Sequence, residues 1–159
     1  MRVGITGHSN LVPECVDAVH AAIRAVLLEE TGRSSLIGVT CLAPGADQVF
    51  ARAVLELGGK VEVVLPAMDY REKLKPERLS AYDELIAKAD IVSVLPFMLS
   101  GRQAYVAANE RMLASVELLV AVWDGEPAGG RGGTGDVVEH ARATGVPVVV
   151  IWPDTARRA

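Results

Sequence analysis

Short apolar runs alternate with longer amphipathic stretches along the whole chain, which is the pattern of strands alternating with helices. In the first long stretch, Val16, Val19, Ile23 and Leu27 recur at the spacing of one helix face. Apolar runs predict strands over residues 2–6, 36–41, 61–65, 91–95, 118–123 and 148–152. Helical spacing predicts helices over residues 12–30, 46–57, 79–87, 105–115 and 134–143.

The predicted strands are apolar at nearly every position rather than at alternate ones, as residues 148–151 illustrate. Strands of this kind are buried on both faces, which is typical of a parallel sheet covered by helices on each side. We therefore predict a single α/β domain over residues 1–159, with a three-layer, Rossmann-like, doubly wound and mainly parallel sheet of about six strands in the order 3-2-1-4-5-6. Residues 69–78 are predicted to form an irregular surface loop, and residues 155–159 a flexible tail.

Composition narrows the class of protein. Half of the 159 residues are hydrophobic, 23% are charged and mean hydropathy is +0.28, so the chain can bury a core. The net charge of -4 disfavours binding of nucleic acid through bulk positive charge, although it leaves a local basic patch open. Since the chain is acidic and only 4% of its residues are aromatic, no specific nucleic-acid partner is expected. Cys15 and Cys41 stand far apart without metal-ligand spacing, so neither a disulfide framework nor a zinc site is expected. No metal and no cofactor are predicted. The absence of a signal peptide and of a membrane-length apolar run predicts a cytoplasmic protein without a membrane partner.

Ligands of doubly wound sheets bind outside the carboxyl ends of the strands, which directs attention to three loops. The most informative is the glycine-rich loop before the last helix, with Gly132, Gly133 and Thr134 at the helix start. Glycines let backbone N–H groups approach a ligand, and a helix N-terminus favours an anion. We predict a phosphate-binding loop; the alternative is a mobile glycine loop in which Thr134 only caps the helix.

The other two loops each leave two interpretations open. After the first strand, Gly7, His8 and Ser9 form either one wall of a ligand site or a tight turn with an inert, half-exposed histidine. After the second strand, Gly45 lies in a turn and Asp47 in the first turn of a helix. Asp47 either complements the helix dipole or holds a ribose hydroxyl.

No arrangement of residues typical of catalysis stands out, so the catalytic residues stay unknown and the protein is not assigned as an enzyme. The weak candidates for acid–base chemistry are Asp124 at a strand end and Asp136 and Glu139 on the last helix. Charged residues near a helix start are usually caps or solvated surface.

Together the three loops resemble the SLOG superfamily, which includes the DNA-processing protein of bacterial competence and the Lonely Guy phosphoribohydrolases. The similarity lies in residues 4–8, in residues 42–47 running on to 58–61, and in residues 132–134, and it spans most of the chain. The resemblance implies a Rossmann-like sheet that binds nucleotides or their derivatives. Relatives usually form dimers or larger assemblies, so a homo-oligomer is expected, with helix 105–115 at the contact between subunits.

The chain departs from the Lonely Guy pattern at the residues that support chemistry. The family's glutamate three residues after the loop threonine is replaced by Val137. Arg111 matches the arginine of an Arg-Lys pair, which predicts a phosphate contact, whereas Met112 replaces the lysine. Ser9 stands where many members have an arginine.

Three hypotheses of function follow. The first is a stand-alone domain that binds a nucleotide or a nucleotide-derived small molecule, through Gly7, His8, Ser9, Gly45, Asp47, Arg111, Gly132, Gly133 and Thr134. The alternative is a phosphoribohydrolase or N-glycosidase of a nucleoside monophosphate, with Glu139, Asp136 or Asp124 as the acid. The third is a structural subunit with a vestigial pocket. The residues do not identify the ligand or the pathway.

Overall fold

The computed structural model describes residues 1–32, 34–127 and 133–159. Its strands are β1 (Arg2–Gly7), β2 (Ile37–Thr40), β3 (Lys60–Leu65), β4 (Ile91–Val94), β5 (Leu118–Val122) and β6 (Val148–Ile151). Its helices are α1 (Val16–Thr31), α2 (Ala46–Glu56), α3 (Leu79–Lys88), α4 (Arg102–Ala114) and α5 (Thr134–Ala143). Every predicted strand and helix is present, and the loop predicted over residues 69–78 contains two short 3-10 turns, Arg71–Lys73 and Pro76–Arg78.

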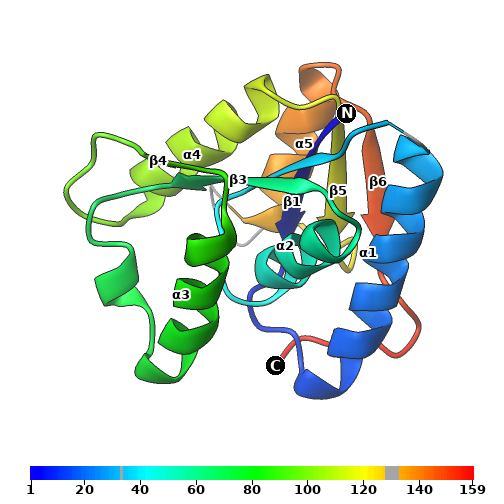
Figure 1. Cartoon of the computed structure of the whole chain (residues 1–159), viewed down its shortest axis with the longest axis horizontal. Coiled ribbons are helices and arrows are strands. Elements are labelled where there is room, and N and C mark those ends of the chain that lie inside the picture. Colours follow the sequence, from blue (N-terminus) through cyan, green and yellow to red (C-terminus); the bar gives the residue numbers. More distant parts are fainter. Residues whose placement is uncertain (33, 128–132) are drawn as a thin grey trace.

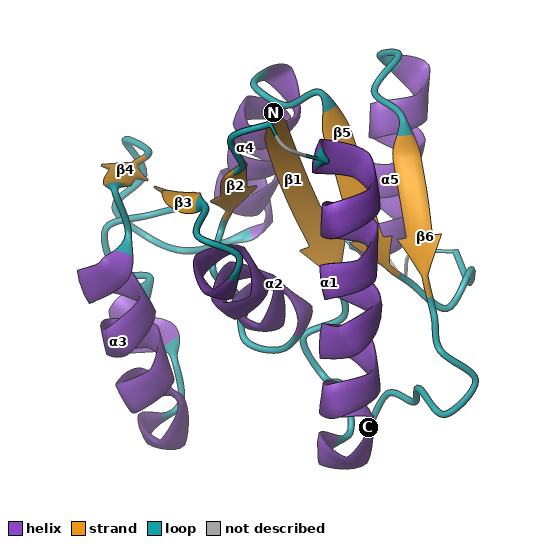
Figure 2. Cartoon of the chain, turned by 45° about the vertical axis from the view of Figure 1, so that its right-hand side comes forward, coloured by secondary structure: helices purple, strands orange, loops and turns teal. Residues whose placement is uncertain are grey.

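The strands form one sheet in which every pairing is parallel, in the order β4-β3-β2-β1-β5-β6. Helices α1, α2 and α3 cover one face of this sheet, and α4 and α5 cover the other (Figures 1 and 2). The prediction of a three-layer, doubly wound α/β fold is therefore confirmed. The chain reverses its direction of winding at β1 and β5, which pair through residues such as Ile5 and Val120.

The predicted strand order 3-2-1-4-5-6 is wrong in one respect. The fourth strand does not return to the first, because β4 pairs with β3 and extends the sheet outward. The long crossover is instead the connection from β4 through α4 to β5, so the switch point lies between β1 and β5 rather than between the first and fourth strands.

The core lies on both sides of the sheet because neighbouring strand residues point to opposite faces. Val3 and Ile5 of β1 pack toward the α1–α2 side, in a cluster that includes Phe50. Between them, Gly4 lies against Met112 of α4, where a Cβ atom would collide with the Met112 sulfur. The absence of a side chain at Gly4 thus makes room for Met112 and lets α4 pack closely against β1.

The position of β4 was predicted wrongly because its sequence looks like that of a central strand. Its apolar residues Ile91, Val92 and Val94 are exposed, although three apolar residues in four are typical of a strand buried on both faces. Met98 and Leu99, in the loop that follows, are exposed as well. In the described chain, no helix is long and apolar enough to cross a membrane.

Candidate functional site

A cavity of about 790 Å³ opens at the carboxyl ends of the central strands, next to the switch point between β1 and β5. All three loops singled out in the sequence contribute to it. Its lining residues from these loops include six of the predicted ones: Gly7, His8, Ser9, Asp47, Gly133 and Thr134. The cavity volume is in the range of ordinary small-molecule sites.

Close backbone packing holds the first two loops together. Gly45 has φ +84°, and a Cβ atom placed there would lie 2.6 Å from the carbonyl oxygen of His8 and 2.9 Å from Ser9 Cα. Gly7 likewise lies against Ala46, whose backbone N–H donates to the His8 carbonyl at 3.3 Å. Gly45 therefore supports the wall of the cavity by its lack of a side chain, and it is not among the lining residues.

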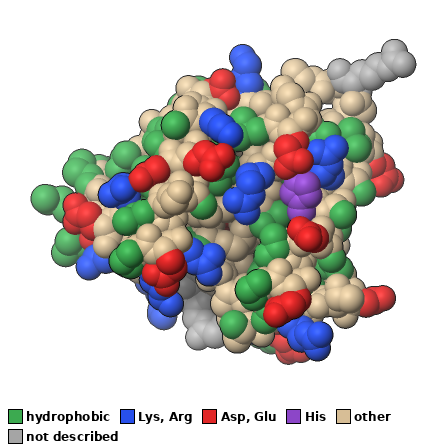
Figure 3. Space-filling view, turned by 60° about the horizontal axis from the view of Figure 1, so that its bottom comes forward, with side chains coloured by type: hydrophobic (Ala, Val, Ile, Leu, Met, Phe, Trp, Pro, Cys, Tyr) green, Lys and Arg blue, Asp and Glu red, His purple; other side chains and the backbone are tan. Residues whose placement is uncertain are grey.

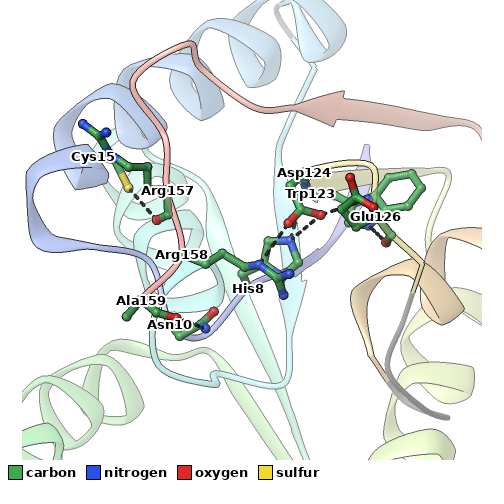
Figure 4. A network of polar contacts seen from close by, with 9 residues as sticks. All are labelled: His8, Asn10, Cys15, Trp123, Asp124, Glu126, Arg157, Arg158 and Ala159. Carbon is green, nitrogen blue, oxygen red and sulfur yellow. Dashed lines mark hydrogen bonds and ion pairs between the residues drawn. The ribbon is translucent and has the colours of Figure 1, made fainter.

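His8 lies at the centre of a polar network at the end of β1 (Figure 4). Its Nε2 is 3.3 Å from the backbone nitrogen of Asp124 and 3.4 Å from Asp124 Oδ1, and its Nδ1 is 3.4 Å from Nη1 of Arg158. The ring also meets Trp152 edge-on, with centroids 5.5 Å apart. His8 is only 8% exposed, so the interpretation as a half-exposed, inert residue does not hold.

Burial is the main reason why the pKa of His8 lies below its ordinary value of 6.5. The Arg158 charge lowers this pKa further, and the Asp124 carboxylate opposes both effects. The imidazole is therefore neutral near pH 7. A proton on Nε2 suits the Asp124 carboxylate and leaves Nδ1 to accept from Arg158, whereas a proton on Nδ1 leaves Nε2 to accept from the backbone.

Asp47 lies in the first turn of α2, as dipole complementation requires, but it is buried and lines the cavity, so both interpretations of this residue stay open. Its Oδ2 accepts a hydrogen bond from the backbone N–H of Ala43 at 3.2 Å, and the Thr40 hydroxyl also bonds to the carboxyl. Burial nevertheless outweighs these bonds and raises the pKa of Asp47 to about 7. The group can thus both donate and accept hydrogen bonds near neutral pH.

The start of α5 faces the same cavity. Gly133 is the N-cap residue, and its carbonyl accepts from the N–H of Val137 at 3.1 Å. Gly133, Thr134 and Gly135 line the cavity, and the first N–H groups of a helix have no carbonyl partner within it. Gly132, the remaining residue of the predicted phosphate loop, lies outside the described residues.

The sequence did not point to four further lining residues of the cavity, which are Tyr70, Lys73, Tyr105 and Asn109. The rings of Tyr70 and Tyr105 meet edge-on with centroids 6.5 Å apart. Tyr70 comes from the loop predicted as irregular, and Tyr105 from the helix assigned to a subunit contact, so their presence in one cavity depends on how α4 packs. Burial raises the pKa of the neighbouring Cys41 thiol well above its ordinary value, which keeps the sulfur protonated.

The segment predicted as a flexible tail also contributes a residue to the cavity. We call residues 154–159 the strap, because they run across the β1–α1 connection (Figure 4). The N–H of Val12 donates to the Arg157 carbonyl at 3.0 Å, Leu11 and Arg158 form an antiparallel bridge, and the N–H of Ala159 donates to the Asn10 carbonyl at 2.7 Å. Arg158 lines the cavity, which no motif in the sequence indicated.

The three candidate acids lie in two different places. Asp136 and Glu139 line a smaller groove of about 320 Å³ between α4 and α5, not the large cavity. Asp124 is not among the lining residues of the large cavity, but it belongs to the network of His8, which lines it, and its Oδ2 is 2.9 Å from Arg158 Nε. Burial of Asp124 is outweighed by the N–H of Glu126, His8 and Arg158, so its pKa lies below the ordinary value. An ionised carboxylate at neutral pH cannot serve as a general acid.

Helix α4 departs from its predicted role. Arg111 is exposed and does not line the large cavity, so this arginine is not positioned for the predicted phosphate contact. Met112 and Leu113 are buried against the sheet of their own chain, and therefore do not form the surface expected to meet a second subunit. The homo-oligomer itself stays a prediction.

Figure 3 brings forward the side toward which β1, β5 and β6 point in Figure 1. Lys and Arg side chains are interspersed there with Asp and Glu, rather than gathered in a stripe of one sign. Among the described lining residues of the cavity, Lys73 and Arg158 are the cations and Asp47 and Glu126 the acids. No cluster of His, Cys, Asp and Glu in the described residues is arranged to hold a metal ion.

Comparisons with known proteins find likeness in structure alone. No family model matches the chain, and no protein of curated function matches it in sequence. DNA processing protein A from Streptococcus pneumoniae superposes with a TM-score of 0.70 at 20% identity, over 97% of this chain and 51% of that one. The Helicobacter pylori protein of the same name gives 0.68 at 18%, over 98% and 66%, and the Moco carrier protein of Chlamydomonas gives 0.55 at 17%, over 94% and 74%.

These likenesses confirm the Rossmann-like fold that the sequence resemblance predicted. The chain spans about half of the pneumococcal protein and 66% of the Helicobacter protein. The structure of the latter concerns a mode of binding single-stranded DNA. This comparison contradicts the prediction that the chain has no specific nucleic-acid partner. Net charge and overall aromatic content were too coarse as criteria, because single-stranded nucleic acid is held by local grooves and by a few aromatic side chains.

Proposed function

We propose that the chain binds a phosphate-bearing nucleotide or nucleotide derivative in the cavity at the carboxyl ends of the central strands, next to the switch point between β1 and β5. One observation carries the proposal: the start of α5, the buried carboxyl of Asp47 and the exposed face of Tyr105 all line a single cavity. A nucleotide needs three kinds of contact, namely donors for phosphate, a hydrogen-bonding group for ribose and a flat apolar surface for the base.

The phosphate end of this proposed site is Gly133 and Thr134. Backbone N–H groups at the start of α5, the positive end of its dipole and the Thr134 hydroxyl favour an anion. Asp47, whose pKa of about 7 leaves it able to donate as well as accept, suits a ribose hydroxyl. Tyr105 lines the cavity, is 39% exposed and can stack on a base.

The test is isothermal titration calorimetry of the wild-type chain with AMP, GMP, CMP and UMP and with the corresponding nucleosides. We expect at least one monophosphate to bind with saturation, and more tightly than its nucleoside. Gly133→Asp adds a side chain and a negative charge where the phosphate approaches, and should abolish this binding. Retention of full affinity in Gly133→Asp would place the phosphate elsewhere, and failure of all four monophosphates to bind would overturn the proposal.

Single-stranded DNA is the second candidate, favoured by the structural likeness to DNA processing protein A over 97–98% of this chain. The nucleotide unit of a strand presents the same phosphate, sugar and base as a free nucleotide. Fluorescence anisotropy with a labelled oligothymidylate separates the two. Tight oligonucleotide binding that a thousandfold excess of mononucleotide fails to displace would favour the nucleic acid over the free nucleotide.

A further inference from the structure

We propose that Arg158 of the strap is a phosphate-binding residue of this site, which Asp124 holds in place until the ligand arrives. The inference rests on the proposed function, since it names the residue that supplies positive charge to the ligand phosphate. It follows from how the strap is anchored, which way Arg158 points and what its guanidinium can bind.

The strap is anchored to the rest of the domain by its backbone. Arg157 offers its carbonyl to the N–H of Val12 at 3.0 Å and to the thiol of Cys15 at 3.7 Å, and Asn10 bonds to Ala159 from both its backbone and its side chain. Ala156 of the strap is buried and packs in the main hydrophobic core cluster. These bonds hold the Cα atom of Arg158 at the edge of the cavity without using its side chain.

Neighbouring side chains of the strap have different surroundings, which gives a matched pair of arginines. Arg158 lines the cavity beside the network of His8 and Asp124, whereas the exposed Arg157 is not among the lining residues (Figure 4). The side chain of Arg158 is 42% exposed, so its guanidinium can turn toward a ligand without disturbing the core.

Asp124 satisfies only part of the guanidinium. Its Oδ2 is 2.9 Å from Arg158 Nε, and Nη1 is 3.4 Å from the neutral ring of His8. A guanidinium carries five N–H donors in a planar fork that fits phosphate oxygens in pairs, so it can gain contacts by turning to a phosphate. Among the described lining residues, the other cation is Lys73, whose backbone N–H donates to the Tyr70 carbonyl at 3.2 Å.

The exchange of partners predicts opposite effects for the two members of the ion pair. Removing Arg158 takes away the charge that binds phosphate. Neutralising Asp124 removes the competitor for that charge and a source of repulsion for the incoming anion. If the ion pair only supported the structure, both substitutions would instead weaken monophosphate binding.

The experiment compares wild type with Arg158→Ala, Arg157→Ala and Asp124→Asn by calorimetry, using the tightest-binding of the four monophosphates and its nucleoside as probes. Arg158→Ala should weaken the monophosphate about 10- to 100-fold, as expected for a charged hydrogen bond, and leave the nucleoside unchanged. Arg157→Ala should change neither, and Asp124→Asn should bind the monophosphate at least as tightly as wild type. Arg158→Lys, which keeps the charge but loses the fork, should fall between wild type and Arg158→Ala and serves if the alanine variant is unstable.

Equal monophosphate affinity in the Arg158→Ala and Arg157→Ala variants would overturn the role of Arg158 while leaving the proposed function intact. An equal loss for monophosphate and nucleoside, or a loss in Asp124→Asn as large as in Arg158→Ala, would likewise assign Arg158 a structural role. Failure of wild type to bind any monophosphate would overturn both proposals.

Discussion

The Nε2 atom of His8 lies 3.4 Å from Oδ1 of Asp124, and yet the pKa of this histidine is lowered. A carboxylate at that distance usually favours the imidazolium. Here burial of the ring and the positive charge of Arg158 outweigh it. His8 therefore serves the cavity as a neutral hydrogen-bonding group, and its pKa reports on where the Arg158 guanidinium lies.

Removing that guanidinium should raise the pKa of His8. In Arg158→Ala the remaining charged neighbour is the Asp124 carboxylate, which favours the protonated ring. An NMR titration of the histidine ring carbons measures this pKa, with His20 and His140 as references in the same spectra. Arg157→Ala should leave the His8 titration unchanged. An unchanged or lower His8 pKa in Arg158→Ala would show that the guanidinium does not lie beside the ring in solution.

The buried carboxyl of Asp47 predicts how stability depends on pH. The unfolded chain releases this proton near 3.8, whereas the folded chain keeps it until a pKa of about 7. Between these values the folded state binds more protons, so the free energy of unfolding contributed by Asp47 falls as pH rises and is constant above about pH 7. The full difference is about 4 to 5 kcal/mol, from roughly 1.4 kcal/mol per pKa unit.

Asp47→Asn should remove this fall, because an amide does not titrate. Urea denaturation at pH 5 and pH 8 measures it in both proteins. Asp17→Asn is the matched control, since Asp17 lies in the first turn of α1 but is exposed. If Asp47→Asn keeps the same difference between the two pH values as wild type, the pH dependence has another origin.

The outline of the fold could be predicted because it depends on local patterns. Helix α5 has the predicted bounds, 134–143, and the other elements differ by a few residues at their ends. The position of β4 could not be predicted, because Ile91, Val92 and Val94 form the same kind of apolar run as a central strand. Which strand becomes an edge depends on how α3 packs beside α2, and no single segment encodes that.

The site was predictable where glycines and helix starts mark it, and not where packing assembles it. Gly7, His8, Asp47 and Thr134 could be chosen because they follow strand ends in the sequence. Arg158 could not, since its place depends on backbone bonds between the strap and the β1–α1 connection. Ser9 stands where many members of the SLOG superfamily have an arginine. The positive charge at this part of the cavity belongs instead to Arg158, which is far from Ser9 in the sequence.

Gly45 and Gly58 differ in how an added side chain would fit. Both have positive φ, +84° and +79°, where alanine is strained, and the ψ of -128° at Gly45 lies outside the left-handed α region, so the strain is greater there. A Cβ atom at Gly58 meets nothing within 4 Å, whereas one at Gly45 would lie 2.6 Å from the His8 carbonyl oxygen. Gly45→Ala should therefore destabilise the fold by about 1–3 kcal/mol more than Gly58→Ala, and weaken ligand binding as well. Equal losses in urea denaturation would mean that the two loops are not in close contact.

Substitution of Glu139 tests whether the chain is a binding protein or a hydrolase. It lines the groove between α4 and α5 together with Val106 and His140, and not the cavity that contains Gly133 and Thr134. Glu139→Gln should therefore leave monophosphate affinity unchanged, and chromatography should detect the same amount of free base with this variant as with wild type. A hydrolase that uses Glu139 as its acid would instead lose about 10²–10⁴-fold in base release, since this is the usual contribution of general acid–base catalysis. That loss, seen with unchanged affinity, would show that the α4–α5 groove reaches the glycosidic bond and that the chain is an enzyme.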